Sequence, residues 1–285
     1  MKKSVLSTLA VAACVLSQGA FAHTGLQYNT ITEGTAATYN AVAITHGCTT
    51  NAGPEGTNGT QLNVLASSAV FPNGTGAVVN KLNADGTDGA AIDLSTVISG
   101  TVAGVFTNMT PVPAFPGVFP FMSVTLDALS NARGMHAWGN ANNTPAMPGV
   151  KSVGLAPFKM AGVSFLADAP GAINCATALK VRIAAANWCL KGKANDKNPA
   201  RADIWIGHMT SKFNDVNTMP YNATDAAAGK FYWPTLTINR DLVKHPLDAS
   251  CGAGYAVAIA PSDADIDAYL PITTKEVPAG YWPNI

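Results

Sequence analysis

Apolar and polar residues alternate over short stretches along most of this chain. Six stretches have the length and alternation that are typical of β-strands, and they cover residues 38–44, 61–66, 121–126, 178–184, 202–207 and 255–259. Clusters rich in Asn, Gly, Pro and Asp, such as residues 51–56 and 83–86, separate them. The pattern therefore predicts a series of strands joined by polar turns.

Helical periodicity is weak everywhere in the chain. Residues 225–229 and 263–269 are each consistent with a short helix at most. The prediction is an all-β fold, a β-sandwich with long decorated loops and at most short helices. Neither an internal repeat nor a shift in composition marks a linker, so we expect residues 23–285 to form a single domain.

The first 22 residues have the features of a signal peptide. Lys2 and Lys3 precede an apolar stretch over residues 5–16, and Ala20-Phe21-Ala22 fits a cleavage site that would leave His23 as the mature N-terminus. Residues 11–14 also resemble a lipobox, which would make Cys14 a lipidated anchor, but the cleavage site after it favours plain secretion. No later stretch runs 18 apolar residues without a charge, Pro or Gly, so we expect no transmembrane segment in the mature chain. The protein is predicted to be secreted, periplasmic or on the outer cell surface.

Charge is sparse and balanced in this sequence. Only 12% of the residues are charged, with 17 Lys and Arg against 17 Asp and Glu. This balance gives no electrostatic reason to expect nucleic acid or an anionic membrane as a partner.

Four of the five cysteines follow the predicted signal peptide: Cys48, Cys175, Cys189 and Cys251. An even number in an oxidising compartment predicts two disulfides, and three pairings are possible. We favour Cys175–Cys189, which would join a local hairpin, together with Cys48–Cys251, which would tie the two ends of the domain. A cysteine-rich metal site is disfavoured because no C-x-x-C spacing occurs.

Histidines provide the main candidates for chemistry. In the stretch 134–139, His136 and Trp138 would share one face of a strand, and the flanking Gly134 and Gly139 indicate a bent or closely approached backbone. The alternative is an ordinary strand that carries a half-buried Trp and a surface His.

A second candidate lies in residues 203–209. Asp203, Trp205 and Gly207 would share one strand face, while His208 would lie at the strand end, where ligands commonly bind. His208 is otherwise a capping or core histidine, and Trp205 fits the core better than a ligand role. Met209 is either a soft copper(I) donor or packing.

His23 and His46 provide a further candidate pair. Cleavage after Ala22 would place the His23 imidazole beside a free α-amine, and His46 lies close in sequence to Cys48. His245 fits an ordinary loop residue. Sequence motifs of serine hydrolases, zinc proteases and phosphate-binding loops are missing, and residues 263–267 match a calcium loop only weakly.

Two family resemblances rest on these residues. Residues 39–48, following an N-terminal His23, resemble the opening of exported YcnI-type domains, which are copper-associated β-sandwiches whose mature N-terminal His is a copper ligand. As a whole, the chain resembles methanotroph copper-repressible surface proteins of the CorA/MopE type in its signal peptide, Ala/Asn/Thr-rich composition and placement of His and Trp.

In the CorA/MopE family, two histidines and a kynurenine made by oxidising a Trp hold one copper(I). The resemblance implies that His136 and His208 are the imidazole ligands and that Trp138 is the oxidised residue, with Trp205 and His208 as the fallback pair. The family order is Trp-x-His, whereas this chain has His136-x-Trp138, and on a strand either order places both residues on one face.

This interpretation is chemically consistent. Copper(I) is soft and binds imidazole well, whereas an intact indole only donates its N–H, so opening the ring creates the amine ligand. We therefore expect an exported, non-catalytic copper(I)-binding protein for copper acquisition, served by an oxidising partner enzyme that modifies the Trp. One alternative is a copper oxygenase braced by His23 and His46, and another is a surface interaction module without metal.

Overall fold

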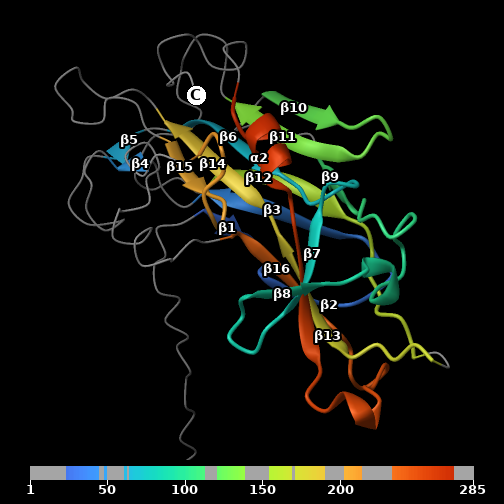
Figure 1. The fold of residues 1–285 in the computed structure, drawn as a ribbon. Helices are drawn as coiled ribbons and strands as arrows, with labels where there is room; N and C mark the ends of the chain where they lie inside the picture. The colour runs from blue at the N-terminus through green and yellow to red at the C-terminus, as the bar shows by residue number, and fades with distance from the viewer. Residues whose placement is uncertain are drawn as a thin grey trace, which may run out of the picture.

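A computed structural model gives the fold and describes residues 24–44, 48–49, 61–62, 64–112, 121–138, 154–168, 171–189, 202–213 and 233–272. Within these residues the protein is built mainly of strands, in three larger sheets and one two-stranded sheet (Figure 1). The predicted all-β, sandwich-like fold is confirmed.

The first two sheets are antiparallel throughout. The four-stranded sheet has the order β1 (Gly25–Leu26), β3 (Thr38–Ile44), β12 (Gly154–Met160), β9 (Met109–Pro111). The five-stranded sheet has the order β10 (Phe121–Leu126), β11 (Ala132–Trp138), β6 (Val64–Val70), β14 (Ala184–Cys189), β15 (Ala202–Trp205). The short strands β4 (Cys48–Thr49) and β5 (Gln61–Leu62) pair with each other.

The six-stranded sheet is mixed. Its order is β2 (Thr30–Thr32), β16 (Thr235–Asn239), β13 (Ala176–Arg182), β17 (Tyr255–Ala260), β7 (Val78–Leu82), β8 (Asp88–Ala91), with the pairs β2–β16 and β13–β17 parallel. The described helical elements are two 3₁₀ turns, η1 (Leu94–Thr96) and η2 (Ala249–Cys251), and one α-helix, α2 (Asp263–Tyr269).

Several predicted elements coincide with observed ones. Strands β3 and β10 and helix α2 have the predicted bounds, because alternation and flanking turn residues agree there. The predicted strand 178–184 spans the boundary between β13 and β14 at Ile183. The predicted short helix at 225–229 lies outside the described residues.

Both faces of the five-stranded sheet are covered. Alternate residues of β14 show this: Ala185 belongs to the large core shared by the three sheets, whereas Ala184 and Ala186 belong to a second apolar cluster on the other face. Helix α2 covers this second face through Ile266 and Leu270, and Figure 1 shows it lying against β11 and β6. The five-stranded sheet is therefore the middle layer between the large core and α2.

Local sequence explains why α2 forms. The Ser262 side chain caps the helix by accepting a hydrogen bond from the Asp265 amide at 3.2 Å. Asp263 and Asp265 place negative charge in the first turn, where the helix dipole favours it. Ile266 and Leu270 are four residues apart, so they bury on one face. No helix among the described residues is long and apolar enough to cross a membrane.

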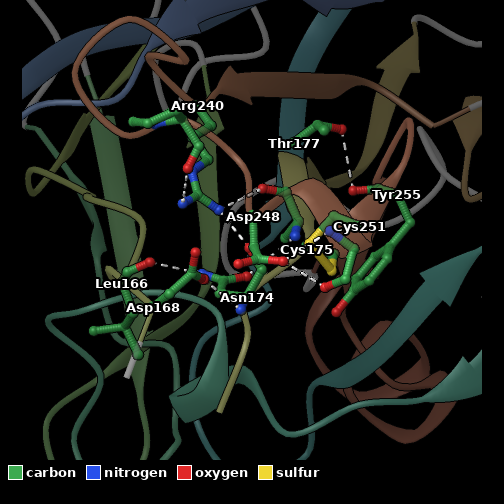
Figure 2. The surroundings of a disulfide bond; sticks show 12 residues. Leu166, Asp168, Asn174, Cys175, Thr177, Arg240, Asp248, Cys251 and Tyr255 are labelled. Carbon is green, nitrogen blue, oxygen red and sulfur yellow. Dashed lines mark hydrogen bonds between the residues drawn. A yellow bond between two sulfur atoms is a disulfide. The ribbon is translucent and has the colours of Figure 1, made fainter. Parts of the chain in front are cut away.

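A disulfide joins Cys175 and Cys251, with Cα atoms 5.2 Å apart (Figure 2). The bond ties together the beginnings of two parallel neighbours, since Cys175 precedes β13 and Cys251 lies shortly before β17. Beside it, the buried Arg240 side chain donates Nη1 to Asn174 O at 2.6 Å, Nε to His245 O at 2.8 Å and Nη2 to Pro246 O at 3.2 Å. Disulfide and guanidinium together hold this end of the sheet.

This bond shows that both favoured pairings, Cys175–Cys189 and Cys48–Cys251, were wrong. The expected hairpin does not exist, because β13 runs on into β14 and the two strands belong to different sheets. Extended strands advance about 3.3 Å per residue, so this run places Cys175 and Cys189 far beyond bonding distance.

Candidate functional site

Helix α2 is the centre of the candidate site, and β11 fixes it at both ends. Near the helix start, the buried Arg133 guanidinium pairs with the Asp265 carboxylate. At the helix end, His136 Nε2 lies 2.7 Å from the backbone oxygen of Tyr269. Between them, Gly134 allows close packing, because a Cβ on this residue would lie 2.8 Å from Tyr269 Cβ. The closely approached backbone that Gly134 suggested is thus observed.

His136 is buried, with 7% of its surface exposed. It does not match the alternative of a surface His beside a Trp. Its neighbour across the ladder, Ser68, donates its hydroxyl to Leu270 O at 2.6 Å and accepts Trp188 Nε1 at 2.8 Å. His136 and Ser68 therefore supply hydrogen bonds to carbonyls at the end of α2, groups that a helix leaves without internal partners. Trp138 is half-buried and packs against the second apolar cluster.

His208 is exposed and follows β15, where the sequence placed it. The strand ends at Trp205, and Gly207 then adopts a positive φ of 68°. His208 Nε2 lies 2.7 Å from the Asp263 carboxylate oxygen Oδ1, and the His208 side chain is 47% exposed. An ionised carboxylate only accepts hydrogen bonds, so it orients this imidazole.

Trp233 lies beside His208, and no sequence pattern pointed to this contact. The two ring centroids are 5.6 Å apart in an edge-to-face arrangement. The indole also occupies the space where Gly207 would carry a side chain, since a Cβ there would lie 1.7 Å from Trp233 Nε1. Glycine is thus required at position 207 both for its φ and for this contact.

A second aspartate of α2 holds the segment that follows His208. Asp267 accepts hydrogen bonds from the hydroxyls of Thr210 and Ser211 and from the Lys212 amide. Asp263 and Asp267 are four residues apart, so they lie on the same side of α2.

The weak match of residues 263–267 to a calcium loop is not reflected in the structure. Asp263, Asp265 and Asp267 each have a different protein partner, so these carboxylates do not converge in the arrangement of a calcium loop.

The remaining candidates are distributed as follows. His136 and His208 contact opposite ends of α2, at Tyr269 and Asp263, so the structure does not bring these two imidazoles to one point. Trp205 is 2% exposed and belongs to the interior, as expected. His23 and His46 lie outside the described residues.

Two further observations bear on metal binding. Within the described ranges, no group of three or more His, Cys, Asp or Glu side chains is arranged to hold a metal ion. His245, to which we assign no role, has Nδ1 2.9 Å from Oε1 of the buried Glu33 carboxylate. Of the described histidines, His208 and His245 combine an accessible ring with a carboxylate partner, and His208 is the more exposed of the two.

Comparison with known proteins adds no relative. No family model, no curated protein and no solved structure matches this chain.

Proposed function

We propose that this protein is an exported copper(I)-binding protein that serves copper acquisition and has no catalytic turnover. The observation that supports the proposal is the pairing of the exposed His208 with Asp263. Metal-binding histidines commonly donate one ring N–H to a carboxylate, which fixes the ring and makes the other nitrogen a better ligand. Copper(I) suits this donor because it is soft and binds neutral imidazole well.

The proposed ligand set is His136, His208 and Trp138 in its oxidised form. A partner enzyme would add dioxygen across the indole C2–C3 bond of Trp138, and hydrolysis of the N-formylkynurenine would release formate and leave the aryl amine of kynurenine. Within this set, His208 is accessible to the ion, whereas His136 holds the end of α2. Binding through both imidazoles requires local movement at one end of α2.

The proposal is tested on protein purified from its native host. Copper content is measured together with the peptide masses around Trp138, and copper(I) affinity is measured by competition with a chromogenic chelator. We expect one copper per chain, a kynurenine at Trp138, and loss of binding in His208→Ala and His136→Ala. His245→Ala is the matched control, because it removes another partly exposed imidazole that pairs with a carboxylate. A wild-type protein without copper would overturn the proposal.

One observation favours a second candidate, the copper oxygenase braced by His23 and His46. Strands β1 and β3 are antiparallel, and Gly25 of β1 lies opposite Ala43 of β3. In the sequence, His23 precedes Thr24 and His46 follows Ile44 by two residues. Copper loss in His23→Ala and His46→Ala, with His208→Ala unchanged, would favour this candidate over the first.

A further inference from the structure

We propose that Asp263 is a positioning residue that holds His208 in one tautomer and thereby presents its Nδ1 atom to copper(I). This inference rests on the proposed function and names the ligand atom. His208 Nε2 lies 2.7 Å from Asp263 Oδ1. Because a carboxylate cannot donate, a neutral His208 carries its hydrogen on Nε2, and the lone pair is on Nδ1.

The surroundings of His208 restrict how its ring can turn. Trp233 lies edge-to-face with the imidazole, at 5.6 Å between centroids. Trp233 is itself packed against the backbone of Gly207, one residue before His208. Further along the chain, Asp267 accepts hydrogen bonds from Thr210 and Ser211. The chain on either side of His208 is thus held, and the ring has contacts with Asp263 and Trp233, before a metal arrives, which lowers the ordering cost of binding.

Asp263 belongs to an anchored helix, so the carboxylate is a fixed support. The Arg133–Asp265 ion pair holds the first turn of α2, and His136 holds its last turn through Tyr269 O. A side chain on a freely moving segment would not set the direction of the His208 lone pair. Removing carboxylates of this kind typically costs about 10- to 100-fold in metal affinity.

Two matched variants test the assignment. Asp263→Asn removes the carboxylate that contacts His208, whereas Asp267→Asn loosens the same segment from the same helix without touching the imidazole. Copper(I) affinity is measured by chelator competition. The tautomer of His208 is measured by two-bond ¹H–¹⁵N NMR on the metal-free protein at about pH 8, where an ordinary histidine is neutral.

We expect the wild type and Asp267→Asn to show the Nε2–H tautomer and to bind copper(I) within a few-fold of each other. Asp263→Asn should give a mixture of tautomers and lose about tenfold or more in affinity, and Asp263→Glu should restore part of both. Silver(I), a diamagnetic soft cation, should shift the ¹⁵N resonance of Nδ1 rather than that of Nε2.

The outcomes separate this inference from the proposed function. If the wild type binds copper(I) and Asp263→Asn binds it equally tightly, Asp263 is not a positioning residue and the inference alone fails. A hydrogen on Nδ1 in the wild type, or a silver shift at Nε2, overturns it in the same way. A wild type that binds no copper(I) overturns the proposed function and the inference together.

Discussion

Gly134 of β11 and Tyr269 of α2 lie in closer contact than any other residue type at position 134 would allow. A Cβ atom at position 134 would be 2.8 Å from Tyr269 Cβ and 3.3 Å from the Tyr269 carbonyl oxygen, whose hydrogen bond comes from His136. Gly134→Ala should therefore displace α2 and lower the free energy of unfolding by about 1–3 kcal/mol.

Urea denaturation of the metal-free protein measures this effect. Gly25→Ala is the control, because a Cβ on Gly25 would meet nothing within 4 Å. Equal unfolding free energies for the two variants would show that α2 tolerates the added methyl group.

The two candidate histidines should differ sharply in their effect on stability. His136→Ala removes a buried side chain that hydrogen-bonds to the Tyr269 carbonyl and should cost about 1–3 kcal/mol of unfolding free energy in the metal-free protein. His208→Ala removes an exposed pair with Asp263 and an exposed edge-to-face contact with Trp233, and it should cost about 1 kcal/mol or less. Thermal unfolding of both variants checks this order, and a reversed order would contradict the assigned roles.

The remaining cysteines should form the second disulfide. Once Cys175 is joined to Cys251, Cys48 and Cys189 are the two left after residue 22. Their backbones belong to neighbouring strands, because Cys48 pairs with Leu62, Cys189 pairs with Val64, and β4 contacts β14. A peptide map without reduction should therefore contain a peptide linked through Cys48 and Cys189. Two free thiols at these positions would contradict the prediction.

Asp127 should make stability fall at acid pH. Hydrogen bonds from Asn131, the largest cause, and the nearby Arg133 cation hold the pKa of the Asp127 carboxyl below its ordinary value. A group with a lowered folded pKa stabilises the fold above its unfolded pKa, and this contribution is lost as pH falls through the folded pKa. Urea midpoints measured from about pH 5 to about pH 2 should therefore fall less steeply for Asp127→Asn than for the wild type.

Local features of the fold were predictable from the sequence. The alternation in residues 38–44 matches β3, in which Asn40, Val42 and Ile44 are buried on one face. The alternation in residues 121–126 likewise matches the bounds of β10. Helix 263–269 was predictable as a short helix, since Ser262 and the acidic first turn favour a helix start. The position of His208 after a strand and a glycine was also correct.

Non-local features were not predictable. The disulfide depends on β13 and β17 being parallel neighbours, and they are far apart in the sequence. The contact of His136 with Tyr269 spans 133 residues, and the packing of Trp233 beside His208 joins two different segments. Alternation gives the face of a strand but not the element that covers that face, so it left these partners unknown.

The Cys175–Cys251 bond closes a covalent ring around part of the candidate site. His208 and Trp233 lie between the two cysteines, whereas α2, with Asp263, follows Cys251. If a protease makes a single cut anywhere inside this ring, the two fragments stay joined through sulfur. His208 and Asp263 would then remain parts of one molecule, so a nicked chain can keep the pairing on which the proposed copper site depends.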